Sequence, residues 1–410
     1  MRDGKRGGPE AEKHGGEEPN DYVIRVFDDL AAIDASQWNA LVDAQTSAIP
    51  FMQHEYLLAM HASGSANGAS GWRPRFLVVS LGETLIAACP LYQKDHSYGE
   101  YVFDWAWADA YQRHGLRYYP KLLCAVPFTP VPGPRLLARD PSGRRLLLRA
   151  MRQLATDAKL SSAHVLFLDD ADAEAARLEG WMMRSTVQFH WRNREPEPYA
   201  DLADFLASLQ REKRKKIQQE RRRVADAGIV FTTLEGAAIA PADWDFFYRC
   251  YCQTYREHHS TPYLTREFFE RMASAMPEHW LLFIASRGDE RIASSLICID
   301  PLRKTAFGRY WGAVEHVPCL HFDACYYQPL GWCINNGFQR FEGGAQGEHK
   351  MARGLLPVQT WSAHWLAHPQ FAQAVSDFLE REGAGVANYI DELNERRPFK
   401  PSAPITTTQT

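Results

Sequence analysis

The sequence predicts a mixed α/β fold made of two similar units in tandem, and three observations carry that prediction. Strand-like and helix-like segments follow one order twice: strand, helix, hairpin, strand, helix, strand. Each half has one hairpin signal, Gly82-Glu83 in the first and Gly288-Asp289 in the second. The prolines of Glu195–Pro198 interrupt helices and strands alike, which is typical of a linker. A chain of 410 residues has the length of two ordinary domains. We expect α/β units at 21–195 and 196–400, with disordered tails at 1–20 and 401–410.

The elements of the first half follow from apolar spacing. Leu146 to Lys159 repeats its apolar residues at helical intervals, and Val165 to Leu168 is an apolar run of strand length. The glycine between two apolar segments marks the hairpin. The expected strands are 22–26, 76–80, 85–91, 165–168 and 181–190, and the expected helices are 35–42 and 146–159.

The second half begins with a long predicted helix. Leu202 to Ala227 ends at Gly228, a natural left-handed residue after a helix. Thr265 precedes an amphipathic run and is a typical N-cap. The expected helices are 202–227, 241–259, 265–276 and 322–335, and the expected strands are 229–234, 280–287, 292–300, 305–312 and 338–342.

Composition argues against several classes of protein. The apolar runs end well before the roughly 18 residues of a membrane-spanning helix, so no integral membrane segment is expected. Residues 1–20 are charged and glycine-rich without an apolar core, which argues against a signal peptide and favours a cytoplasmic protein. The net charge of −4 argues against a surface that binds polyanions everywhere. The eight cysteines form no Cys-x-x-Cys pair, so we expect reduced thiols and no metal site.

The first predicted helix of the second half carries a dense basic segment. Arg211 to Arg223 holds eight basic and two acidic residues. One interpretation is a clamp for the phosphates of a coenzyme A tail, a tRNA backbone or an anionic lipid head group. The other is a solvated helix face neutralised by acids elsewhere. The candidate phosphate-binding residues are Lys213, Arg214, Lys215 and Lys216.

Glycine stands at both ends of the aromatic strand Gly308–Gly312. Glycine inside a strand often marks a bulge or the close approach of a ligand. A bulge there would aim a backbone N–H at an acyl carbonyl and stabilise an oxyanion. The alternative is a bend with packed aromatic rings. We count Tyr310 as a candidate catalytic residue, and Arg309 and Trp311 as candidate substrate-binding residues.

The next predicted helix begins with His321 and Cys325, which are four residues apart and so lie on one face. Cys325 is either an acyl-carrying nucleophile activated by His321 or a buried helical cysteine. The phenols that follow either donate hydrogen bonds or pack. The candidate substrate-binding residues here are His321, Tyr326 and Tyr327.

The segment 343–353 combines three glycines with an acid, an imidazole and two cations. Glycines let the backbone approach a ligand closely. Glu348 or His349 is the candidate base for an amine, so both are counted as catalytic. The alternative is a polar loop that caps a helix. The candidate residues for holding phosphate, carboxylate or other substrate groups are Gln346, Lys350 and Arg353.

Two further segments contribute candidate substrate-binding residues. Alternation in Trp361–Trp365 places Ser362 and His364 on one strand face, which borders a cleft or solvent. Residues 98–135 concentrate aromatic residues and prolines, which is typical of a stiff loop system that builds a binding cleft. Its candidates are Tyr118 and Lys121.

Four stretches carry a resemblance to a known family. They are His-Ser-Tyr-Gly-Glu-Tyr-Val-Phe-Asp at 96–104, Tyr-Tyr-Pro-Lys at 118–121, Gly-Arg-Tyr-Trp-Gly at 308–312 and Gly-Ala-Gln-Gly-Glu-His-Lys at 344–350. Over about 21–398 the chain resembles the FemAB-like predicted N-acyltransferases of bacteria, within the GCN5-related acetyltransferase superfamily. The resemblance implies two GCN5-related acyltransferase-like domains in tandem. Its better-known relatives move an aminoacyl group from tRNA to an amine of a peptidoglycan precursor.

The resemblance implies an N-acyltransferase in which an amine attacks an activated ester or thioester directly. Acyl-CoA or aminoacyl-tRNA would be the donor, and a small-molecule, lipid or peptide amine the acceptor. Residues 313–320 hold no glycine where classical acetyltransferases have a Gly-rich pyrophosphate loop, which counts against ordinary acetyl-CoA binding. One alternative is a non-catalytic binding module for a cell-wall or lipid precursor. The other is a nucleic-acid binder, against which the lack of aromatic residues in 211–223 counts.

Overall fold

The order of helices and strands in the first half follows the predicted one. The computed structural model describes residues 22–344 and 347–400; Gln346 and both expected tails lie outside these ranges. The strands are β1 Tyr22–Phe27, β2 Trp72–Pro74, β3 Phe76–Leu81, β4 Thr84–Cys89, β5 Leu91–Lys94, β6 Lys121–Cys124, β7 Leu137–Ala138, β8 Ser162–Leu168 and β9 Met182–Arg192. The helices are α1 Ala35–Asp43, α2 His54–Ala62, α3 Trp105–Arg113, α4 Pro141–Asp157 and α5 Asp170–Leu178.

The second half repeats the pattern and ends in a long helix. Its strands are β10 Ile229–Glu235, β11 Trp280–Arg287, β12 Glu290–Asp300, β13 Thr305–Ala313, β14 Arg340–Glu342 and β15 Leu356–Leu366. Its helices are α6 Leu202–Ser208, α7 Arg211–Asp226, α8 Pro241–Glu257, α9 Arg266–Ala275, α10 Leu320–Phe322, α11 Gln328–Asn335 and α12 Pro369–Glu395. A π-helical turn, Asp323–Tyr327, joins α10 to α11, and a 3-10 helix, Glu348–Arg353, precedes β15.

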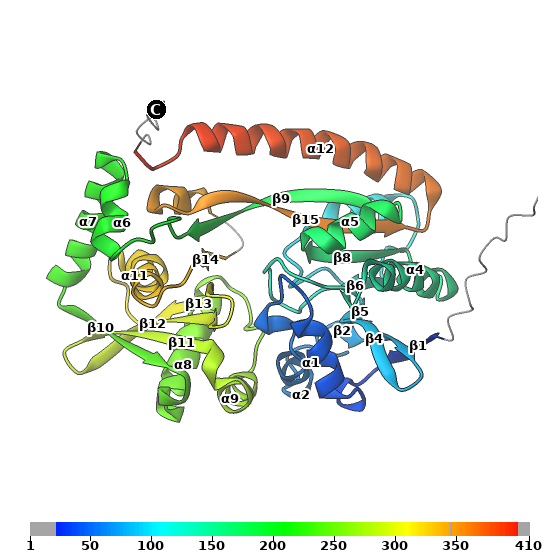
Figure 1. Ribbon diagram of the computed structural model, residues 1–410, viewed down its shortest axis with the longest axis horizontal. Coiled ribbons are helices and arrows are strands. Elements are labelled where there is room, and N and C mark those ends of the chain that lie inside the picture. Colours follow the sequence, from blue (N-terminus) through cyan, green and yellow to red (C-terminus); the bar gives the residue numbers. More distant parts are fainter. Residues whose placement is uncertain (1–21, 345–346, 401–410) are drawn as a thin grey trace, which may run out of the picture.

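One sheet of 11 strands runs through both halves (Figure 1). Its order is β10-β11-β12-β13-β14-β9-β15-β8-β6-β5-β2, and a second sheet has the order β1-β3-β4-β7. The sheet is continuous because β9 pairs with β14, and β15 returns to pair antiparallel with both β8 and β9. Helix α12 then lies along β9 and β15. The predicted mixed α/β fold is confirmed.

The two halves also share a hydrophobic core. Phe51 of the first half contacts Phe307 of β13 edge to face, with ring centroids 5.2 Å apart. Tyr56 contacts Phe268 of α9 in the same way at 5.5 Å. Burying such rings against each other stabilises the junction between the halves. These contacts hold the first half against β13, the strand that carries the candidate site.

Several elements were not predicted, among them α2, α5 and the short strands β2, β5, β6 and β7. Three further differences have a clear physical cause. The helix predicted at 202–227 is broken into α6 and α7, because Leu209 is extended and buried and Gln210 N donates to the Pro398 carbonyl at 2.8 Å. Helix α3 lies inside the segment 98–135, which was predicted as loops. The 27-residue α12 was not predicted either, since few of its residues are buried.

Membrane-spanning helices, disulfides and metal sites were searched for in the residues that the structure describes. Within 22–344 and 347–400, no helix has both the length and the apolar composition to cross a membrane. All eight cysteines are free, and five of them are buried. In the same ranges no cluster of three metal-ligating side chains occurs.

Candidate active site

A β-bulge in β13 forms the centre of the candidate site. The register with β12 runs from Leu296 opposite Tyr310 to Ile297 opposite Gly308, so Arg309 is the extra residue. A bulge breaks the alternation of side chains. Arg309 and Tyr310 consequently face the same side of the sheet, where Arg309 stacks on Phe51 and Tyr310 packs on α8 and α9. The bulge predicted from the two glycines is present.

The pairing between β13 and β14 ends just before the bulge. Their parallel pairing ends with Phe307 opposite Glu342. Gly308 and Gly344 then border a gap between the strands. A Cβ atom on Gly344 would lie 3.7 Å from the Gly308 carbonyl oxygen and 3.9 Å from Lys350 Nζ. Neither glycine places a side chain in this gap, and both line the cavity beside it.

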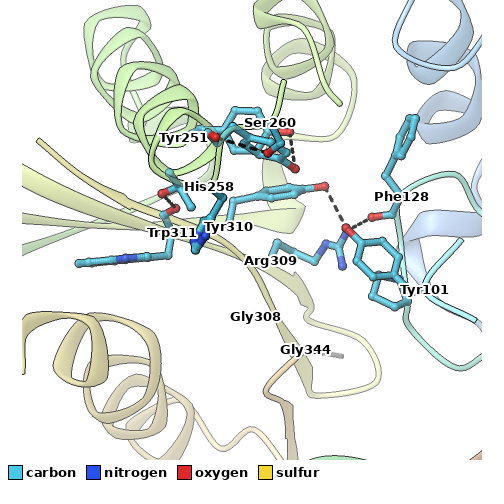
Figure 2. A pocket seen from close by; sticks show the side chains of 13 residues that line it. Tyr101, Phe128, Tyr251, His258, Ser260, Gly308, Arg309, Tyr310, Trp311 and Gly344 are labelled. Atoms are coloured by element: carbon cyan, nitrogen blue, oxygen red, sulfur yellow. Dashed lines mark hydrogen bonds between the residues drawn. The ribbon is translucent and has the colours of Figure 1, made fainter. Parts of the chain in front are cut away.

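On the side of α8 the gap opens into a cavity that we call the bulge pocket. It has a volume of about 310 Å³ and is surrounded by residues of both halves (Figure 2). Aromatic rings dominate the lining, which is typical of a site for an apolar or aromatic group. The lining residues are Tyr101, Phe128, Pro130, Tyr251, Thr254, Tyr255, His258, Ser260, Gly308, Arg309, Tyr310, Trp311 and Gly344.

Arg309 ties the bulge to the first half. Its Nη2 donates to the Phe128 carbonyl at 3.1 Å and to the Tyr310 hydroxyl at 3.0 Å, as Figure 2 shows. Its Nε is buried without a hydrogen-bond partner in the described ranges. The guanidinium therefore positions Tyr310 and the pocket wall and retains one free donor.

Two aromatic residues of the pocket wall have unusual backbone conformations. Tyr101 and Phe128 have φ values of 61° and 54°, in the left-handed region. A Cβ on Gly99 would lie 2.5 Å from the Phe128 ring, so this ring is seated against a bare backbone. Strain of this kind is typical of functional sites because the surroundings must compensate for it. Burial raises the pKa of Tyr101 to about 12, so its hydroxyl remains neutral at physiological pH.

Lys350 lies on the opposite side of the gap. Its side chain is buried, and Nζ donates to the Gly344 carbonyl at 2.9 Å. Burial lowers the pKa of Lys350 to about 8. Within the described ranges it forms no ion pair. A buried ammonium at the mouth of the gap is placed to stabilise negative charge that develops there.

A cluster of rings continues from Lys350 along the same side of the sheet. Trp311 contacts His321 with ring centroids 5.4 Å apart, and His321 contacts Tyr326 at 5.9 Å. The Tyr326 hydroxyl lies 3.3 Å from Nε2 of His349. Burial, assisted by the neighbouring cations, lowers the pKa of His321 to about 4. These predicted residues are thus brought together around the gap.

Glu348 and His349 border a second cavity, the α7 groove. It has a volume of about 420 Å³ and is lined by residues of α7, the 3-10 helix and the end of α12, among them Lys213 and Arg396. Glu348 is exposed and accepts a hydrogen bond from Tyr389 of α12 at 3.3 Å. Both predicted bases therefore lie on the side of Lys350, and Tyr310 lies on the side of the bulge pocket.

Arg353 and Tyr327 belong to a buried ion pair. Nη2 of Arg353 lies 3.1 Å from Oε2 of Glu220 on α7, and the Tyr327 hydroxyl donates to the same oxygen. The guanidinium also stacks on Phe322 at 3.5 Å. These contacts attach the 3-10 helix to α7. Both terminal nitrogens of the Arg353 guanidinium have hydrogen-bond partners, and its Nε has none in the described residues.

Most of the positive charge of α7 is unpaired. Of its eight lysines and arginines, Arg221 alone forms an ion pair in the described part of the chain, at 3.9 Å from Asp323. Lys215 and Lys216 are exposed, whereas Lys213 and Arg214 are half-buried. Seven of its eight cations thus have no acidic partner in the described residues, and one of the seven, Lys213, lines the α7 groove.

The sequence matches one protein family over most of its length. The family model described as FemAB-like, peptidoglycan biosynthesis and recognition, matches residues 29–401. The chain belongs to the FemAB-like family. The resemblance stated from four short stretches is therefore confirmed, and the chain is an acyltransferase that moves acyl or aminoacyl groups. No curated protein sequence matches it.

Solved structures resemble this FemAB-like chain at low sequence identity, and the first two named here share its fold. The L-PGS of Bacillus licheniformis is 10% identical with a TM-score of 0.50, over 84% of this chain and 97% of that one. The C-terminal domain of a putative lysylphosphatidylglycerol synthetase from Agrobacterium fabrum is 11% identical with a TM-score of 0.51, over 84% and 96%. FemX is 10% identical with a TM-score of 0.49, over 84% and 98%.

The remaining predicted residues of the FemAB-like chain lie in a buried network of the first half. Lys121 Nζ donates to Oε2 of Glu100 at 2.8 Å and also contacts Asp104. Burial disfavours its charged form, but these two acids outweigh burial and raise the pKa of Lys121. The network includes Tyr118, His164, Ser362 and His364. Because Glu100 precedes Tyr101, it anchors the loop that forms the wall of the bulge pocket.

Sequence reasoning missed several residues of the pocket. Tyr251 and Tyr255 lie one helical turn apart on α8, a spacing visible in the sequence, but such a stripe usually marks core. His258 and Ser260 follow at the end of that helix. Glu342, the last residue of β14, carries no signal in the sequence beyond an acid before two glycines.

Proposed function

We propose that this protein transfers an acyl or aminoacyl group to an amine at the gap between β13 and β14. The observation that carries the proposal is the parting of these strands at a bulge, with Gly308 and Gly344 bordering the opening. The acyl group would lie in the bulge pocket, and backbone N–H groups of Arg309–Trp311 would stabilise the tetrahedral oxyanion. Lys350 would stabilise the charge on the departing atom.

The donor would enter from the side of α7. Helix α7 has 16 residues and is about 24 Å long. Free cations along that length suit a nucleic-acid backbone better than the few phosphates of coenzyme A. The absence of glycine in 313–320 points the same way. We therefore favour aminoacyl-tRNA over acyl-CoA as the donor, with Glu348 and His349 bordering its path in the α7 groove.

Transfer assays with two donors test the proposal. The full chain would be incubated with radiolabelled aminoacyl-tRNA or acetyl-CoA and with amine fractions of a bacterial extract, and labelled amide would be measured. We expect amide from aminoacyl-tRNA, a loss of at least tenfold in Lys350→Met, and full activity in Lys159→Met, which alters an exposed lysine. Ligand binding without amide from either donor would instead indicate a non-catalytic binding module.

A further inference from the structure

A large polar cavity lies beside the bulge pocket, and we call it the arginine cavity. It has a volume of about 850 Å³ and is lined by residues of both halves. The proline-rich segment 127–135 separates the two cavities: Phe128 and Pro130 line the bulge pocket, whereas Pro132 and Gly133 line the arginine cavity. Gln188 holds this segment by donating to the Pro130 carbonyl at 2.8 Å.

Both cavities open onto the same stretch of β13 and β14. Phe307 and Glu342 line the arginine cavity. Gly308, the residue after Phe307, and Gly344, two residues after Glu342, line the bulge pocket. A molecule in the arginine cavity is thus adjacent to an acyl group held at the gap.

Two arginines of this cavity stand directly opposite each other. Arg192 of β9 pairs in register with Arg340 of β14. Like charges at such positions destabilise a sheet. Among the described residues neither arginine pairs with an acid, and a third, Arg303, pairs with Asp300 at 3.3 Å. The fork of a guanidinium matches phosphate and carboxylate, so a bound oxyanion would relieve this repulsion.

Glu342 supplies a buried carboxyl to the same cavity. Its side chain is 13% exposed, and its Oε2 has no hydrogen-bond partner in the described part of the chain. Nδ1 of His190 lies 3.9 Å from its Oε1. Burial raises the pKa of Glu342 to about 8, close to the value that suits a general base at physiological pH. The free oxygen and the position beside the gap suit proton transfer.

The charge balance of the cavity narrows the class of ligand. Asp169, Asp170 and Glu195 line it together with the arginines, so it is not strongly positive as a whole. A simple polyanion would meet these acids as well as the cations. A molecule that carries both a positive amine and an oxyanion matches the mixed lining better.

We propose that the arginine cavity binds the acceptor, an amine that also carries a phosphate or carboxylate, and that Glu342 receives the amine's proton. This inference rests on the proposed acyl transfer. In the step, the nitrogen–carbon bond forms and the donor's carbon–oxygen or carbon–sulfur bond breaks. The proton that the amine loses passes through Glu342 to the departing oxygen or sulfur. Arg192 and Arg340 hold the oxyanion and so orient the amine toward the gap.

Thermal unfolding with small oxyanions tests the site independently of activity. Inorganic phosphate and malonate serve as probes, because a ligand of the folded state raises Tm. We expect at least one probe to raise Tm in the wild type, and its apparent affinity to fall at least tenfold in Arg340→Gln but not in Arg152→Gln, which alters an exposed arginine of α4. The probe that gives the larger shift in Tm indicates whether the site prefers a phosphate or a carboxylate. An unchanged shift in Arg340→Gln, or no shift at all, overturns the inference even if acyl transfer is found.

Kinetics then test Glu342 once a donor is known. Arg340→Gln is expected to raise the acceptor KM at least tenfold with little change in kcat. Glu342→Gln is expected to lower kcat at least a hundredfold while the probe still raises Tm. Equal kcat in Glu342→Gln and wild type would refute the role of this carboxyl and leave the oxyanion site standing.

Discussion

Replacing Glu342 with glutamine should change how the stability of the protein depends on pH. Burial raises the pKa of this carboxyl from 4.5 to about 8, against the opposing effect of Arg340, Arg309 and Arg135. Between these two values the folded chain keeps a proton that the unfolded chain has lost. The free energy of unfolding therefore falls as pH rises from 4.5 to 8. Glutamine has no such proton, so this contribution disappears in the variant.

The size of the effect follows from the two pKa values. Between pH 5 and pH 8, linkage of one group with these values amounts to about 3 to 4 kcal/mol. Asp172 and Glu100 are also buried acids with pKa values raised to about 8 and about 7. Both are present in the wild type and in the variant. The difference between the two proteins therefore isolates Glu342.

Urea unfolding at pH 5 and at pH 8 measures this difference. We expect Glu342→Gln to be more stable than the wild type at pH 8, relative to pH 5, by an amount of that order. Glutamate and glutamine have nearly the same shape, so packing contributes little. Parallel pH profiles for the two proteins would show that Glu342 is not held protonated by burial, and the reasoning would fail.

Three further predictions concern the other side of the gap. Arg353→Met should destabilise the fold by about 3–5 kcal/mol in urea unfolding, because it leaves Glu220 buried without its cation, and replacing Glu220 as well should recover much of the loss. Glu348→Ala and His349→Ala should raise the donor KM and keep most of kcat in steady-state assays; loss of turnover in both would identify one of them as the base. Lys213→Gln should weaken tRNA binding and reduce its dependence on salt by roughly one counterion, and an unchanged salt dependence would exclude a phosphate contact.

Local patterns predicted much of the fold and the centre of the site. Hairpin glycines, apolar spacing and the N-cap Thr265 lie where the sequence placed them, because each acts over a few residues. The pair Gly308 and Gly312 predicted a bulge that the register of β12 and β13 confirms. The basic helix was also predicted, and in the described residues Arg221 alone among its cations pairs with an acid.

Features that depend on distant segments were not predictable from the sequence. The break between α6 and α7 depends on a hydrogen bond to Pro398, far along the chain. The insertion of β15 between β8 and β9 joins the halves into one sheet, and alternation within β15 gives no information about its neighbours. Arg353 was predicted to hold substrate, but only the fold shows that Glu220 faces it. For the same reason the arginine cavity, lined by residues of five strands and of several loops, was missed.

Narrowing the gap tests the central claim, transfer between β13 and β14, most directly. Gly344→Val and Gly337→Val form a matched pair, because both glycines have left-handed backbones, with φ of 83° and 69°, but a side chain on Gly337 meets open space. The measurement is single-turnover transfer of a radiolabelled aminoacyl group to amide. We predict that Gly337→Val transfers the label like the wild type, whereas Gly344→Val loses at least tenfold in rate with its fold intact by circular dichroism. Equal rates in the two variants would contradict the account.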